Sequence, residues 1–238
     1  MVEAGPKDQA TADANGKTAA RRTRTSSKKK PEPPTTLLMV RHGKTPTTGK
    51  LLPGRAPGLH LSDEGRSDAA TIAARLFDAH PKPVAIYCSP MERAVETASP
   101  YAALTGIEPV QNRAIIECDF GEWTGRELSE LSKLDQWRTV QQRPSLFRFP
   151  GGESFVEMSD RMRSFMLEME ERHKGQVVVA FSHADPIKAL VADCLGMHLD
   201  QFQRIVISTT SVSILSIDHG VPYVAGVNIT ASITKGTN

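Results

Sequence analysis

The stretch that decides the fold is Leu37-Leu38-Met39-Val40-Arg41-His42-Gly43, a short apolar run that ends in two basic residues and a glycine. A continuous apolar run of this length is typical of a β-strand buried on both faces. Similar runs follow at residues 84–88, 177–181 and 212–217, and amphipathic helical patterns occur at 66–79, 128–142, 155–169 and 186–195. This alternation predicts an α/β fold with a parallel sheet covered by helices.

The first 36 residues have a different composition. They contain eight Lys/Arg and four Asp/Glu, whereas the rest of the chain contains 21 and 23, and they offer almost no bulky apolar side chains. A segment that cannot bury apolar surface cannot offset the entropy of folding. We therefore predict a disordered basic tail over residues 1–36 and one folded domain over residues 37–238.

The charge and cysteine content narrow the function classes. The near-neutral domain has no basic footprint of a nucleic-acid binder, and no stretch has the apolar length of a secretory signal or a membrane span. Cys88, Cys118 and Cys194 lack the spacing of a zinc site. We expect a cytoplasmic protein with reduced cysteines and with neither nucleic acid nor membrane as a partner. Nothing in the pattern indicates an oligomeric state.

Basic side chains follow the first predicted strand, at the edge where open α/β sheets bind ligands. His42 could act as a nucleophile if one ring nitrogen keeps its proton by bonding a backbone carbonyl, which leaves the other lone pair free to attack phosphorus. Arg41 would supply positive charge for phosphoryl oxygens, and Gly43 would allow a close turn. Taken alone, this tripeptide also fits a structural histidine at a strand end.

Two further strands deliver polar residues to the same edge. Arg93 opens a helix after the second strand, where a cation is unfavourable unless an anion lies nearby, although pairing with Glu92 or Glu96 is an alternative. His183 follows the strand over 177–181 and could stabilise the charge that develops during phosphoryl transfer. The convergence of these residues with Arg41 and His42 is far more specific than any one of them.

Phosphoryl transfer to a histidine also needs an acid that protonates the leaving alkoxide. Glu117 is the candidate, because apolar neighbours could exclude water and favour its protonated form. Asp119 and Glu122 compete by residue type, but their more polar surroundings favour solvated loop carboxylates.

Together these motifs resemble the histidine phosphatase superfamily, in its phosphoglycerate-mutase-like branch. The resemblance spans about residues 37–220 and rests on Arg41-His42-Gly43-x-Thr45, Leu61-x-x-x-Gly65, Ser89-Pro90-x-x-Arg93-Ala94-x-x-Thr97-Ala98, Glu117-x-x-x-Gly121-x-Trp123-x-Gly125, Gly151-Gly152-Glu153-Ser154 and Ser182-His183. It implies a three-layer α/β/α fold with a mostly parallel sheet and a phosphohistidine intermediate. It also implies catalytic His42, Glu117 and His183, phosphate binding by Arg41, Arg93 and Thr45, and no metal or other cofactor.

Some positions depart from the family pattern and bear on the substrate. Asp185 follows the second histidine and could either tune the pocket or cap the helix that begins at Pro186. Arg55, Glu153 and Ser154 lie in loops over the strand ends and are candidates for substrate contact. The extension typical of glycolytic mutases is missing between residues 46 and 61. These features favour a phosphatase that acts on a small phosphorylated metabolite.

Two alternatives stay open at this point, and the spacing of the residues argues against a third. A phosphomutase would use the same machinery, and a non-catalytic phosphate-binding protein would share the fold. A cysteine phosphatase could use Cys88 and Arg93, but only four residues separate them, whereas that class resembles Cys-x5-Arg.

Overall fold

The computed structural model describes residues 32–80 and 82–230, so most of the predicted tail lies outside the described residues. The first strand begins at Thr35, two residues before the predicted start of the domain, because Thr35 and Thr36 already pair with Ile217 and Ser216. No helix in these two ranges is long and apolar enough to cross a membrane.

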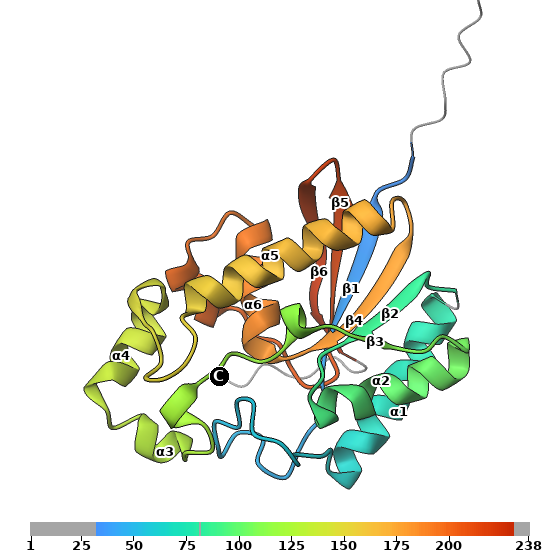
Figure 1. The fold of residues 1–238 in the computed structure, drawn as a ribbon. Helices are drawn as coiled ribbons and strands as arrows, with labels where there is room; N and C mark the ends of the chain where they lie inside the picture. Colours follow the sequence, from blue (N-terminus) through green and yellow to red (C-terminus); the bar gives the residue numbers. More distant parts are fainter. Residues whose placement is uncertain (1–31, 81, 231–238) are drawn as a thin grey trace, which may run out of the picture. The chain divides into compact units, whose positions relative to one another are not determined.

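The described strands form one six-stranded sheet in the order β3-β2-β4-β1-β5-β6 (Figure 1). Their bounds are β1 Thr35–Arg41, β2 Ala85–Cys88, β3 Val110–Gln111, β4 Val177–Ser182, β5 Val212–Asp218 and β6 Val221–Ile229. The pairs β3–β2, β2–β4 and β4–β1 are parallel, which confirms the predicted mostly parallel sheet. The apolar run at 212–217 is the exception: it forms β5, which lies antiparallel to β1 and to β6, its neighbour across a tight hairpin.

Helices cover both faces of this sheet (Figure 1). The four long helices are α1 Asp63–Ala79, α2 Glu92–Thr105, α5 Phe155–Arg172 and α6 Ala184–Cys194. Leu38 and Val40 of β1 lie in one buried cluster with residues of α1 and α2, whereas Leu37 and Met39 lie in another with residues of α5 and α6. Successive strand residues thus point to opposite helical layers, which explains the continuous apolar run and confirms the three-layer arrangement.

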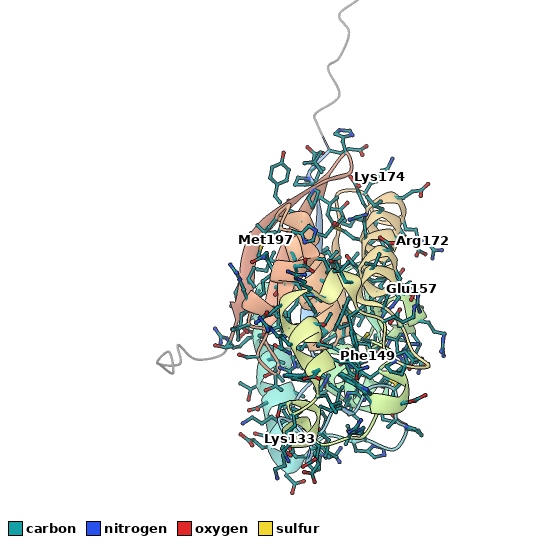
Figure 2. The ribbon with its side chains drawn as sticks, turned by 90° about the vertical axis from the view of Figure 1, so that its left-hand side faces the viewer. Lys133, Phe149, Glu157, Arg172, Lys174 and Met197 are labelled. Carbon is teal, nitrogen blue, oxygen red and sulfur yellow. The ribbon has the colours of Figure 1, made fainter. Side chains whose placement is uncertain are left out.

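The segment between α2 and α5 forms a third buried cluster beside the sheet. Instead of the single predicted helix over 128–142, it contains α3 Leu128–Leu131 and α4 Asp135–Gln142. The turn between them lets both Leu131 and Val140 reach an aromatic cluster that includes Phe149. Phe149 lies inside the molecule, whereas Lys133, Glu157 and Arg172 project from its surface (Figure 2). Local periodicity cannot predict this break, because packing at long range causes it.

Candidate active site

The predicted site residues meet at the carboxyl ends of β1, β4 and β2, which are neighbours in the sheet. The His42 backbone N–H donates to the Ser182 carbonyl at 2.9 Å, and the Ser89 N–H donates to the Phe181 carbonyl at 2.9 Å. These bonds hold the segments that follow the three strands side by side at one edge of the sheet. The ring centroids of His42 and His183 are 5.1 Å apart.

His42 is buried and held in one orientation. Its Nδ1 lies 2.7 Å from the Gly43 carbonyl oxygen, which can only accept, so Nδ1 carries the proton and Nε2 keeps its lone pair. Nε2 accepts from Arg93 Nε at 3.3 Å. Burial, together with the charges of Arg93 and Arg41, lowers the pKa of His42 well below its usual value. The imidazole is therefore neutral at physiological pH, the state that a nucleophile requires.

Arg93 and Arg41 place positive charge beside this ring. Arg93 is fully buried and pairs with neither Glu92 nor Glu96; instead, it also donates to the Gly54 carbonyl at 2.9 Å. Arg41 donates to the Ile207 carbonyl at 2.6 Å. Arg41 Nε and Arg93 Nη1 are buried N–H groups with no hydrogen-bond partner among the described residues. Buried donors of this kind are costly unless an acceptor binds them.

His183 is fully buried next to His42. Its Nε2 lies 2.7 Å from the Ser89 hydroxyl, and its Nδ1 has no hydrogen-bond partner in the described chain. Ser89 and Thr97 belong to the motif that carries Arg93, and both have a role in the site that was not predicted from the sequence. Thr97 accepts from the Gly43 N–H at 3.0 Å and so fixes the turn beneath the histidine.

Glu117 is the buried carboxyl group of the site. Its Oε1 accepts from the Cys118 N–H at 2.9 Å, and its Oε2 lies 3.8 Å from His183 Nδ1. Burial raises the pKa of Glu117 to about 7, and the negative charge of Asp185 adds to the rise. Its competitors lie elsewhere: Glu122 is exposed, and Asp119 pairs with Arg55 at 3.3 Å.

The loop after β1 depends on close backbone packing. A Cβ atom on Gly65 would lie 2.1 Å from the Lys44 carbonyl oxygen, so only glycine fits there. The Thr45 N–H donates to the Thr48 hydroxyl at 2.9 Å, and the two hydroxyls are 3.0 Å apart. Lys44, by contrast, turns away from the site and pairs with Glu64.

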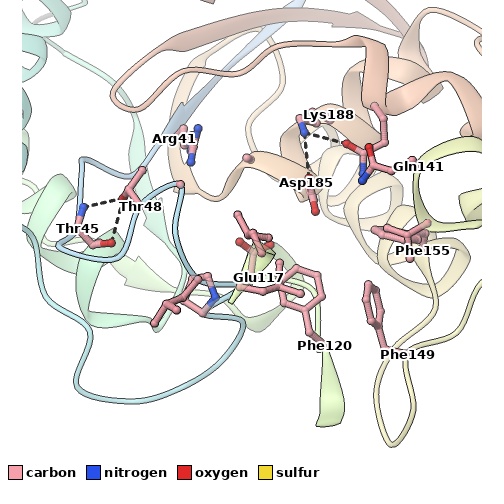
Figure 3. Close-up of a pocket in the computed structure, with 18 of the residues that line it drawn as sticks. Arg41, Thr45, Thr48, Glu117, Phe120, Gln141, Phe149, Phe155, Asp185 and Lys188 are labelled. Carbon is pink, nitrogen blue, oxygen red and sulfur yellow. Dashed lines mark hydrogen bonds and ion pairs between the residues drawn. The ribbon is translucent and has the colours of Figure 1, made fainter. Parts of the chain in front are cut away.

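A cavity of about 280 Å³ opens over these side chains (Figure 3). Arg41, His42, Thr45 and Glu117 line one part of it. Its remaining wall combines apolar side chains with a few polar ones, and includes Leu51, Leu52, Phe120, Trp137, Asp185 and Lys188. The shape and lining suit a small ligand with an anionic end.

The three loop candidates for substrate contact do not line this cavity, and their polar groups have partners within the protein. The Arg55 guanidinium donates to the Glu117 carbonyl at 2.8 Å and to the Glu153 carboxylate at 3.0 Å. Glu153 also pairs with Arg161 at 2.7 Å, and Ser154 caps the N-terminus of α5. Arg55 thus supports the backbone of Glu117 and is itself held by Glu153, while the Ser154 hydroxyl is bonded to Glu157 at the start of α5.

Asp185 also differs from the favoured expectation. The N-cap of α6 is His183, whereas Asp185 lies within the first turn and its side chain lines the cavity. The alternative that it tunes the pocket fits this position. The cysteine alternative does not fit, because Cys88 is buried in β2 and burial raises the pKa of its thiol to about 11.

Comparison with known proteins agrees with this geometry. A family model of the histidine phosphatase superfamily (branch 1) matches residues 37–230. Phosphoserine phosphatase 1 of Hydrogenobacter thermophilus is 30% identical over 202 residues, which cover 83% of this chain and 93% of the relative. An acid phosphatase of Mycobacterium tuberculosis is 26% identical and covers 82% of this chain and 92% of its own length. Among solved structures, Bacillus stearothermophilus YhfR superposes with a TM-score of 0.76 at 28% identity, covering 83% of this chain and 98% of that one.

Proposed function

Because this chain belongs to the histidine phosphatase superfamily, we propose that it hydrolyses a small phosphorylated metabolite through a phosphohistidine on His42. One observation carries the proposal. Arg41 Nε, Arg93 Nη1 and His183 Nδ1 are buried and have no hydrogen-bond partner in the described chain. They belong to three side chains next to His42: Arg93 bonds its Nε2, the His183 ring lies 5.1 Å away, and the charge of Arg41 helps to lower its pKa. Three unpartnered N–H groups beside one nucleophile match the oxygens of a bound phosphoryl group.

The first step transfers the phosphoryl group from the substrate oxygen to Nε2 of His42. The P–N bond forms as the P–O bond breaks, while the Gly43 carbonyl holds the Nδ1 proton and so stabilises the ring as it becomes positive. Arg93, which donates to Nε2 in the free enzyme, would turn its N–H groups to the phosphoryl oxygens. Arg41 adds charge from the neighbouring position.

We assign the proton of His183 to Nδ1, with the Ser89 hydroxyl donating to Nε2. In this tautomer His183 donates to a phosphoryl oxygen and stays neutral, which agrees with the lowering of its pKa by burial and by Arg93. Thr45 lines the same part of the cavity and would add a hydroxyl donor.

Glu117 is the proposed proton donor to the leaving alkoxide. A carboxyl group whose pKa is about 7 is protonated in a large fraction of molecules at neutral pH, and it can take a proton back from the water that attacks the phosphohistidine. The cavity of about 280 Å³ lies at the small end of ligand sites, which favours a metabolite over a phosphoprotein.

The test is to trap the intermediate. The full chain is mixed with p-nitrophenyl phosphate that carries a radiolabelled phosphoryl group, and is then quenched in alkali, in which phosphohistidine survives. We expect labelled protein and released inorganic phosphate from the wild type, and no label from His42→Ala. His219→Asn, which alters a solvent-exposed histidine, is the matched control and should keep the label. Label that persists in His42→Ala would refute the proposal.

A further inference from the structure

The first turn of α6 places an acidic side chain in a cavity built for an anion. Asp185 lines the same cavity as Arg41, His42 and Glu117. Its side chain is 19% exposed, and its Oδ1 accepts from Lys188 Nζ at 3.2 Å. The dipole of α6 stabilises an acidic residue in this turn, but it does not explain why the carboxylate faces the ligand space.

Within the described residues, one oxygen of this carboxylate has a hydrogen-bond donor, and its charge also interacts with that of Arg41. Lys188 holds Oδ1 and also donates to the Gln203 side chain at 3.1 Å, so the lysine is fixed by two acceptors. Among residues 32–80 and 82–230, none donates a hydrogen bond to Asp185 Oδ2. Figure 3 shows Asp185 directed toward Glu117 and Phe120 and bonded to Lys188, which lines the same cavity. The arrangement presents a fixed acceptor to whatever fills the cavity.

We propose that Asp185 Oδ2 accepts a hydrogen bond from a protonated amine of the substrate, so that the preferred substrates are phosphomonoesters whose organic part carries an ammonium group. A partly desolvated carboxylate repels a second anionic group on the ligand and attracts a cation. An ammonium group supplies both charge and N–H donors to the free oxygen. This inference rests on the proposed phosphatase function.

Asp185 and the phosphoryl site share one small cavity. Asp185 lies two residues after His183, in the first turn of α6, and lines the same cavity as His42. We therefore expect a short chain, of about two or three carbon atoms, between the phosphoryl oxygen and the amine. The limited cavity volume points to the same small size.

The experiment compares two substrates of the same shape, O-phosphoethanolamine and 2-hydroxyethyl phosphate, which differ in an ammonium and a hydroxyl group. We expect the wild type to have a kcat/KM for the amine at least about tenfold higher, and Asp185→Asn to lose most of that ratio, because a hydrogen bond to a charged group is worth about a factor of ten or more. Both substrates have an alkyl leaving group, so any change in Glu117 that does not depend on the bound substrate affects both rates alike and leaves the ratio unchanged.

Asp193→Asn is the matched control. Asp193 is on the same helix and its side chain is 21% exposed, but it pairs with Arg163 away from this cavity. It should leave the ratio unchanged. A wild-type ratio near one, or an Asp185→Asn ratio equal to that of the wild type, would overturn the inference. Turnover of p-nitrophenyl phosphate that depends on His42 separates this failure from failure of the proposed function.

Discussion

Replacing Glu117 with Gln should separate substrates by their leaving groups. Gln keeps the size of the side chain and an acceptor for the Cys118 N–H, but it cannot donate a proton to an alkoxide. An alkyl phosphate needs that proton, whereas p-nitrophenolate leaves without it. General acid catalysis contributes about 10²- to 10⁴-fold, so we expect a loss of that size on an alkyl phosphate and a loss below about tenfold on p-nitrophenyl phosphate.

The pH profile gives a second measure of the same proton. With a pKa of about 7, Glu117 is about nine-tenths protonated at pH 6 and about one-tenth protonated at pH 8. The kcat/KM of the wild type on an alkyl phosphate should therefore fall about tenfold for each pH unit above 7. This decrease, the alkaline limb of the profile, should be absent in Glu117→Gln. Initial rates on 2-hydroxyethyl phosphate and p-nitrophenyl phosphate between pH 5 and 9 would measure both effects.

Asp119→Asn provides the matched control, because Asp119 is two residues away and its side chain is 40% exposed. It should keep the alkaline limb and the ratio between the two substrates. Equal losses on the alkyl and the aryl substrate in Glu117→Gln would refute the assignment of Glu117 as the proton donor. So would a limb that disappears in Asp119→Asn instead.

Three further predictions follow from contacts around the site. Arg55→Met removes the donor to the Glu117 carbonyl, so it should lower the turnover of an alkyl phosphate more than that of an aryl phosphate, with a smaller effect than Glu117→Gln. Equal losses on both substrates would contradict this positioning role. Gly65→Ala forces a Cβ against the Lys44 carbonyl and should lower the free energy of unfolding by about 1–3 kcal/mol in urea titrations, while an unchanged midpoint would count against the close packing. Glu117 binds its proton more tightly when folded, so its contribution to stability should fall as the pH rises from 4.5 to about 7, opposite in sign to the contributions of His42 and His183, whose pKa values burial lowers. Glu117→Gln removes the Glu117 contribution alone and should gain about 3 kcal/mol relative to the wild type over that range, at about 1.36 kcal/mol per pKa unit; a constant difference would contradict the raised pKa.

Much of the fold and the centre of the site could be predicted from the sequence because both depend on strand ends. A buried strand has a continuous apolar pattern, and parallel strands must end at the same edge, so His42, Arg93 and His183 could be placed together without coordinates. The direction of β5 could not be predicted, since an apolar run is the same in either orientation.

The residues around that centre depend on contacts between distant segments. Arg55 reaches Glu117 and Glu153, which are 62 and 98 positions away, and no local pattern distinguishes such an arginine from one that binds substrate. Ser89 could have been found, because it precedes the helix that carries Arg93 and directly follows β2, the strand that pairs with β4. The position of Asp185 could not be predicted, because it depends on which residue caps α6. In the structure the N-cap is His183, whose backbone is extended, and Asp185 lies inside the first turn.

The two carboxyl groups in this anion-binding cavity have connected roles. Asp185 contributes to the raised pKa of Glu117, so it helps to keep this carboxyl group protonated before the substrate binds. If an ammonium group then binds at Asp185, it neutralises that negative charge and lowers the pKa of Glu117, which makes the carboxyl group a stronger acid while the alkoxide leaves. A substrate without the amine leaves Glu117 a weaker acid. The same contact that selects the substrate would thus also favour proton transfer to it, and selectivity would be expressed in kcat as well as in KM.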